Sequence, residues 1–99
     1  MKLQMHSIRF DADQSLITFI QDKADKLDKF YDRIIDGEVF LRLDKDDQNE
    51  NKIIELKLNI PGNQLFVKER SRTFEAATDL AVETMKRQLK KYKDKMFAH

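Results

Sequence analysis

The sequence predicts an α+β fold in which a four-stranded sheet is covered on one face by two helices. Apolar residues recur at every second position in four stretches and at every third or fourth position in two longer ones. These stretches follow one another in the order βαβββα. Two layers bury the apolar surface of such elements best. Since 99 residues cannot fill a second core, we expect one domain over residues 1–99.

The first strand and the first helix are predicted at the start of the chain. Leu3 and Met5 alternate with polar neighbours, and the alternation then restarts one position out of phase, which indicates a bulge or an early end. Asp13 is the expected N-cap of a helix from about residue 14 to 32. The buried face of this helix is predicted to consist of Leu16, Ile20, Ala24, Leu27 and Tyr31.

Three further strands are predicted from alternation of period two. Residues 39–43 and 54–60 alternate apolar with polar side chains, and the polar stretch 44–51 between them reads as a solvated hairpin loop. Proline and glycine at positions 61–62 suit the centre of a type II turn. Residues 65–70 alternate again, so a fourth strand is expected to pair with the third.

The last segment, from about residue 73 to 96, is predicted to be a long amphipathic helix. Neither glycine nor proline interrupts it, and one face is formed by Phe74, Thr78, Ala81, Val82, Met85, Leu89, Tyr92 and Met96. Lys86, Lys90 and Lys93 line one flank of that face. Arg87 and Lys91 continue round the outer side, so this basic face is expected to stay in solvent.

Charge is unevenly distributed along a chain that is almost neutral, with 19 basic and 18 acidic residues. Residues 86–95 hold six basic side chains and one acid, a balance of six minus one, +5. Residues 36–50 hold six acids and two basic side chains, a balance of −4. In the first helix, the basic stripe Lys23, Lys26, Lys29 and Arg33 is expected beside the acidic stripe Asp22, Asp25, Asp28 and Asp32.

The residues needed for catalysis or metal binding are scarce. The sequence has two histidines, His6 and His99, no cysteine, no glycine-rich phosphate loop and no HExxH motif, so we expect no enzyme, cofactor or metal site. The acidic loop lacks the glycine and the glutamate of a calcium-binding EF-hand. No stretch approaches the ~18 apolar residues of a membrane span, and we expect a cytoplasmic protein.

The basic helix is the most concentrated feature, and three explanations are open. One or two lysines near a helix C-terminus offset the helix dipole, but like charges four residues apart, such as Lys86 with Lys90, destabilise a helix. An external anion would compensate that repulsion. Nucleic acid is the favoured partner, ahead of a merely solvated face and of an acidic protein or membrane surface. RNA is favoured over DNA. Phe66 or Tyr92 is a candidate for stacking a base, although core packing is the favoured role of Tyr92, which lies on the apolar face of its helix.

Three motifs resemble those of the bacterial ribosome hibernation-promoting factors. They are K-x-x-K-L-x-x-F-x-D-R-I at 23–34, V-F-L-R at 39–42 and R-Q-L-x-K-x-K-D-K at 87–95. That family includes the ribosome-associated inhibitor and the sigma-54 modulation or ribosomal subunit interface proteins, and this chain resembles its short form. Where the family often has an aromatic residue followed by Ala-Ala-Ile-Asp, this chain has FEAATD at 74–79. The fold expected overall resembles that of double-stranded-RNA-binding domains.

The resemblance implies a translation inhibitor of stationary phase or stress that occupies the messenger and transfer RNA channel of the small ribosomal subunit. Its partners would be that subunit and its ribosomal RNA, with no membrane or small-molecule substrate, and it would be a monomer off the ribosome. The phosphate contacts carried over by motif are Lys23, Lys26, Arg33, Arg87, Lys91, Lys93 and Lys95. Helix geometry adds Lys29, Lys86 and Lys90. The alternative is a general RNA-binding module or a protein-binding regulatory module.

Overall fold

A computed structural model describes residues 1–45 and 50–97 of the protein. The elements are β1 (Leu3–Ser7), α1 (Gln14–Phe30), β2 (Asp36–Leu43), β3 (Lys52–Ile60), β4 (Asn63–Ser71) and α2 (Phe74–Phe97). The predicted order βαβββα is therefore confirmed. Of the acidic loop, residues 46–49 lie outside the described residues, as does His99.

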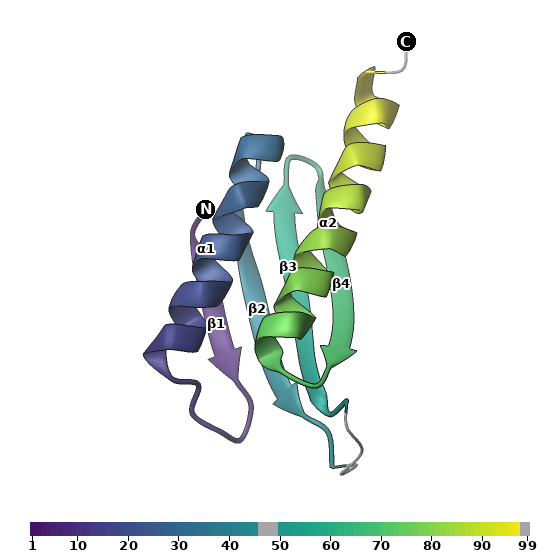
Figure 1. Ribbon diagram of the computed structural model, residues 1–99. Helices are drawn as coiled ribbons and strands as arrows, with labels where there is room; N and C mark the ends of the chain where they lie inside the picture. The colour runs from purple at the N-terminus through teal and green to yellow at the C-terminus, as the bar shows by residue number, and fades with distance from the viewer. Residues whose placement is uncertain (46–49, 98–99) are drawn as a thin grey trace.

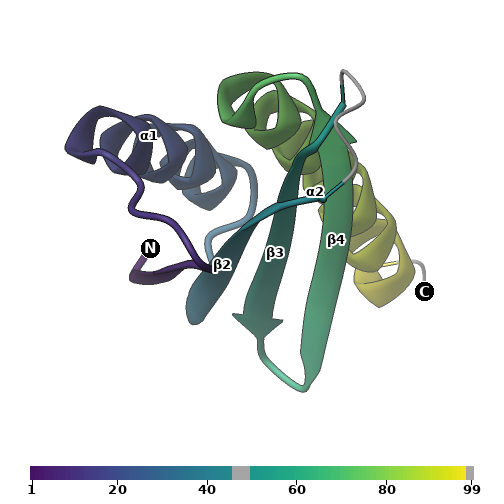
Figure 2. The same cartoon turned by 90° about the horizontal axis from the view of Figure 1, so that it is seen from below.

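The four strands form one sheet in the order β1-β2-β3-β4, in which β1 runs parallel to β2 and the other neighbours are antiparallel. Both helices lie on the same face of that sheet, as Figures 1 and 2 show. They run side by side in the same direction, and α2 extends beyond the end of α1 (Figure 1). The predicted two-layer α+β sandwich is confirmed.

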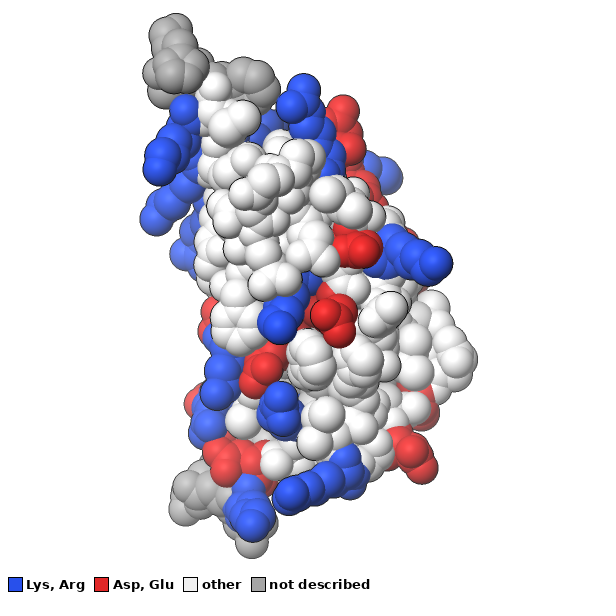
Figure 3. All heavy atoms as spheres, turned by 180° about the vertical axis from the view of Figure 1, so that it is seen from behind, with Lys and Arg blue, Asp and Glu red and all other residues white. Residues whose placement is uncertain are grey.

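The core lies between the helix layer and the sheet. Side chains from both layers are buried there: Ile20, Leu27, Leu41, Leu56, Leu58, Met85 and Leu89 are all at most 2% exposed. Strand alternation turns the other side chains of the sheet toward its uncovered face, where basic, acidic and uncharged residues are mixed (Figure 3).

Two local predictions are confirmed by backbone geometry and hydrogen bonding. The carboxylate of Asp13 accepts hydrogen bonds from the backbone N–H of Leu16 and the hydroxyl of Ser15, both at 2.9 Å, and these bonds lower its pKa. Gly62 has a φ of 75°, as the third residue of a type II turn requires. The sequence therefore locates the start of α1 and the β3–β4 turn correctly.

One predicted element end needs correction and another is confirmed. The first helix was expected to reach residue 32, but it ends at Phe30, because Tyr31 is extended, with φ −142° and ψ 111°. The N–H of Tyr31 donates to the carbonyl of Leu27, and its side chain turns into the core with 8% exposed. Arg33 consequently lies beyond the helix rather than on its basic stripe. The first strand ends at Ser7, the early end that the broken alternation predicted.

Gly37 is the position where the sheet leaves no room for a side chain. A Cβ there would lie 2.8 Å from Cδ2 of Leu58 and 2.9 Å from the carbonyl oxygen of Lys57. Because a backbone atom cannot move aside easily, Gly37→Ala is expected to lower the free energy of unfolding by about 1–3 kcal/mol, measured by urea denaturation. Lys68→Ala, an exposed change on β4, should stay within about 0.5 kcal/mol. A Gly37→Ala protein as stable as that control would contradict this packing.

Candidate nucleic-acid interface

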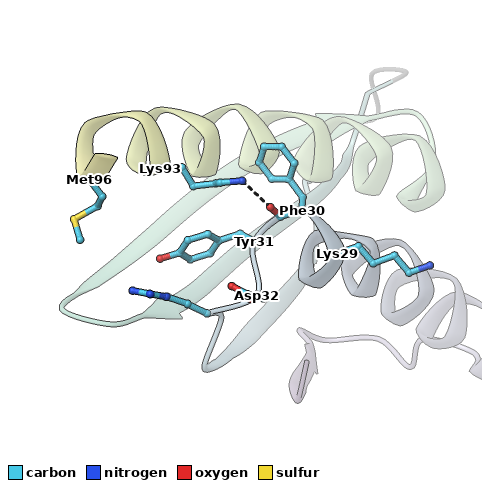
Figure 4. A pocket seen from close by; sticks show the side chains of 7 residues that line it. Lys29, Phe30, Tyr31, Asp32, Lys93 and Met96 are labelled. Carbon is cyan, nitrogen blue, oxygen red and sulfur yellow. Dashed lines mark hydrogen bonds between the residues drawn. The ribbon is translucent and has the colours of Figure 1, made fainter. Parts of the chain in front are cut away.

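The end of α1 packs against the middle of α2 at Phe30. The ammonium of Lys86 lies 5.4 Å from the centre of the Phe30 ring and that of Lys93 lies 4.7 Å from it. Lys93 also donates a hydrogen bond of 3.1 Å to the carbonyl oxygen of Phe30 (Figure 4). Cations over an aromatic face are attracted by its quadrupole. Phe30 therefore holds two cations of α2 next to the end of α1.

Two hollows lie beside Phe30, one along the helices and one at the end of α1. The first, here called the helix groove, is lined by Lys26, Leu27, Lys29, Phe30, Val82, Glu83 and Lys86. The second, here called the end pocket, has a volume of about 390 Å³ and is lined by Lys29, Phe30, Tyr31, Asp32, Arg33, Lys93 and Met96. Because the two hollows share Lys29 and Phe30, they are neighbours. Five of the ten predicted cations line them.

Four more predicted cations continue from these hollows along the outer side of α2. Arg87, Lys90, Lys91 and Lys95 are all exposed. We call the set of nine the cationic surface: Lys26, Lys29, Arg33, Lys86, Arg87, Lys90, Lys91, Lys93 and Lys95. Within residues 1–45 and 50–97, none of the nine forms an ion pair with a carboxylate. In the view from behind, basic side chains project past the sheet on the side of α2 (Figure 3).

Lys23 differs from the other predicted cations. Its ammonium forms an ion pair with Asp79 at 3.3 Å and lies 5.4 Å from the ring centre of Phe19. Asp79 belongs to the first turns of α2, whereas the cationic surface occupies the second half of that helix. The structure thus places the charge of Lys23 beside a carboxylate and apart from the others.

The acidic stripe of α1 has partners of its own. Asp25 accepts a hydrogen bond of 3.1 Å from the amino group of Met1 and another of 2.8 Å from Gln21, and Asp28 also accepts from Met1. The bonds to Asp28 and Asp25 raise the pKa of that amino group above its usual value. Two of the four acids are therefore occupied by the N-terminus rather than by the lysines of the basic stripe.

The two aromatic candidates for base stacking lie in different surroundings. Tyr92 packs edge-on against Tyr31, with ring centres 6.2 Å apart, and its hydroxyl donates to the carbonyl of Pro61 at 3.1 Å. It is a packing residue at the edge of the core. Phe66 is 46% exposed and pairs with Lys57 on the uncovered face of the sheet, so it lies on the other side of the molecule from the cationic surface.

Sequence reasoning missed Phe30 and Met96 as parts of the site. Phe30 appears in the basic motif at 23–34, but only its contacts with two lysines of α2 reveal its role. Met96 was assigned to the apolar face of its helix, yet its side chain is 51% exposed and lines the end pocket. The sequence signal that could have indicated this exposure is the length of the second helix. Met96 lies near its end, and the first helix is shorter.

Other kinds of site find no support among the described residues. No group of three or more His, Asp or Glu side chains there could hold a metal ion. His6 lies 3.1 Å from a carboxylate oxygen of Glu38 and stacks on Phe40 with ring centres 4.8 Å apart, so its neighbours belong to the adjacent strand β2. Within the same residues, no helix is both long and apolar enough to cross a membrane.

Residues 3–96 match the family model described as sigma 54 modulation protein / S30EA ribosomal protein. A ribosome hibernation promotion factor of Deinococcus radiodurans is 29% identical over 91 residues, which are 91% of this chain and 48% of that protein. The chain thus spans about half the length of this relative. A ribosome hibernation promoting factor of Klebsiella oxytoca is 27% identical over 99 residues, the full length of both chains.

Two solved structures share the fold. A ribosomal subunit interface protein from Coxiella burnetii aligns with a TM-score of 0.84 at 22% identity, covering 94% of this chain and 98% of that one. The N-terminal domain of Protein Y from Thermus thermophilus aligns with a TM-score of 0.81 at 22% identity, covering 93% and 99% of the two chains. The arrangement of both helices on one face of a four-stranded sheet is therefore shared with these proteins.

Proposed function

The chain belongs to the family of sigma 54 modulation proteins and S30EA ribosomal proteins, and on that premise we propose that it binds the small ribosomal subunit and inhibits translation. The family predicted from the three motifs is confirmed. The names of the relatives in Deinococcus radiodurans and Klebsiella oxytoca, both ribosome hibernation factors, support the proposal. The protein would then act without catalysis, by occupying a site, in the cytoplasm where ribosomes are found.

The cationic surface is the observation that carries this proposal. Nine basic side chains from α1, the turn after it and the second half of α2 make up this surface, and eight of them are exposed. Lysine and arginine contacts with phosphates supply most of the affinity of non-specific RNA binding. Like charges held this close repel one another, so a polyanion that neutralises them relieves that repulsion. Ribosomal RNA is such a polyanion.

We propose further that the domain lies in the channel of the small subunit that messenger and transfer RNA use. The proposed RNA contacts are the ten predicted residues, Lys23, Lys26, Lys29, Arg33, Lys86, Arg87, Lys90, Lys91, Lys93 and Lys95. Lys23 can contact RNA only if it leaves its ion pair with Asp79. The Asp79 side chain is 55% exposed, so this ion pair contributes little to stability. Inhibition follows because the bound domain and the RNA ligands exclude each other.

The proposal predicts competition with transfer RNA on the small subunit. Purified protein, added in large molar excess to small subunits programmed with messenger RNA, should reduce retention of initiator transfer RNA on filters by more than about tenfold when its concentration is well above its dissociation constant. Undiminished transfer RNA binding on subunits that have demonstrably bound the protein would refute occupancy of the channel.

A control separates this proposal from general RNA binding. A plain RNA duplex should bind the protein much more weakly than the small subunit does, because a duplex presents only part of the irregular phosphate surface that ribosomal RNA offers. Equal affinity for both would favour the alternative of a general RNA-binding module.

A further inference from the structure

The end pocket has a chemistry that phosphate binding alone does not need. The chain turns away from the helix at Tyr31, while α2 continues past the end of α1 (Figure 1). The pocket lies beneath the last turns of α2, where Figure 4 shows the side chains that line it. Its volume of about 390 Å³ lies in the range of small-molecule sites, about 300–1,000 Å³. A double helix cannot enter such a space, but a single nucleotide can.

One part of the pocket wall is apolar and suits a flat ring. Tyr31 lines the pocket although it is only 8% exposed, and its ring packs edge-on against Tyr92. Met96 is 51% exposed and contributes its thioether from the opposite element, α2. Figure 4 shows both side chains bordering the same hollow. Methionine is polarizable and adapts its shape, and it makes favourable contacts with aromatic rings.

The other part of the wall is charged. Arg33 is exposed, and within the described residues its guanidinium has no ion-pair partner, so it is available to a phosphate or to stack on a base. Lys93 uses one of its three donors on the carbonyl of Phe30 and keeps two. Asp32 supplies a carboxylate that can accept from a base amino group or a ribose hydroxyl. Lys29 points away from Tyr31 along α1 (Figure 4), toward the helix groove that it also lines.

We propose that the end pocket receives one unstacked nucleotide of the RNA that the cationic surface binds. The base packs between Tyr31 and Met96, and the phosphate lies against Arg33 and Lys93. This inference rests on the proposed function and adds a recognition step to it. Proteins read RNA mainly where bases are splayed out of a helix, at bulges and loops, by stacking them on aromatic side chains or arginine. The cationic surface would then hold the RNA backbone while the pocket selects an irregular position in it.

Matched RNA hairpins test the proposal directly. One hairpin carries a single-nucleotide bulge and the other is fully paired, and dissociation constants are measured by fluorescence anisotropy with the whole chain. The protein is expected to bind the bulged hairpin about tenfold more tightly, since stacking one base contributes a factor of this order. Equal affinity for the two hairpins would overturn the proposal.

Two single variants test whether the preference for the bulged hairpin depends on the end pocket. Met96→Ser removes the exposed apolar wall without adding charge and without disturbing the core. The ratio of the dissociation constants of the paired and bulged hairpins should therefore fall to nearly one. Lys91→Ala, outside the pocket, should weaken binding of both hairpins equally and keep their ratio. A ratio that Met96→Ser leaves unchanged would overturn the pocket assignment.

A second readout uses the methionine methyl groups, because Met96 is exposed whereas Met85 is fully buried. Adding AMP to methyl-labelled protein should shift the NMR resonance of Met96 and leave that of Met85 in place, and ribose 5-phosphate should not reproduce the shift. An equal shift with ribose 5-phosphate or inorganic phosphate would mean an anion site only and would overturn base binding.

Binding to the small subunit and nucleotide binding in the end pocket can be refuted independently. Wild-type protein that binds small subunits but shows no bulge preference refutes the pocket and leaves the proposed function standing. Wild-type protein that binds no small subunits but keeps the bulge preference refutes the proposed function and leaves the pocket standing. AMP bound more tightly than the bulged hairpin would point to a free nucleotide and overturn the proposal.

Discussion

Replacing Arg87, Lys90 and Lys91 together by alanine is expected to weaken binding to small ribosomal subunits by at least about 100-fold. All three side chains are exposed on α2 and make no ion pair in the described part of the chain. A hydrogen bond to a charged group contributes about 1.5 kcal/mol or more, and 1.4 kcal/mol is a factor of ten in affinity. Alanine favours helix and removes like-charge repulsion, so the free energy of unfolding should not fall. Quantitative cosedimentation and urea denaturation measure the two effects.

The matched control removes the same charge elsewhere. Lys2, Lys68 and Arg72 are exposed and lie outside the cationic surface. Changing these three to alanine should weaken binding to small subunits by less than about tenfold, because only the general attraction between net charges is altered. Equal loss of affinity in the two triple variants would mean that net charge, rather than the cationic surface, determines binding.

Leu27→Ala is expected to lower the free energy of unfolding by about 2–5 kcal/mol, the usual range for a leucine buried in a core. Leu27 is 1% exposed, belongs to the last turn of α1 and lines the helix groove against α2. The cavity left by alanine loosens the contact that holds Lys26 and Lys29 beside α2. For a domain of this size the melting temperature should fall by at least about 8 °C, measured by circular dichroism.

Ile35→Ala serves as the control for this prediction. Ile35 is 60% exposed, so the same kind of truncation should change stability by no more than about 0.5 kcal/mol. If Leu27→Ala were as stable as Ile35→Ala, the docking of α1 on the core described above would be wrong.

Local sequence rules were enough to predict the fold. The switch between periods of two and of three to four marks every strand and helix, Asp13 marks the start of α1, and a Pro-Gly pair marks the β3–β4 turn. These features depend on residues close together in the chain. The end of α1 was missed because Tyr31 is buried as the helical pattern predicts, while its backbone is extended, and the pattern does not distinguish the two conformations.

The site was predictable only in part, for the same reason. Periodicity predicted correctly that Arg87, Lys90 and Lys91 stay exposed, since it fixes positions around a single helix. It could not show that Lys93 is half buried against Phe30, a residue 63 positions earlier, nor that Lys23 pairs with Asp79. Such contacts depend on how α1 and α2 face each other, which no local pattern specifies.

The central claim is that ribosomal phosphates hold the protein through the cationic surface. Its most direct test is the dissociation constant for small subunits, measured at a series of salt concentrations. If about five phosphates are neutralised, at about 0.7 to 0.9 per phosphate, the logarithm of affinity should fall by roughly four for each unit in the logarithm of salt concentration. In the Arg87, Lys90, Lys91 variant the slope should be smaller by two to three, at about one per lost contact. Affinity that is independent of salt, or a slope that this variant shares with the wild type, would contradict the account.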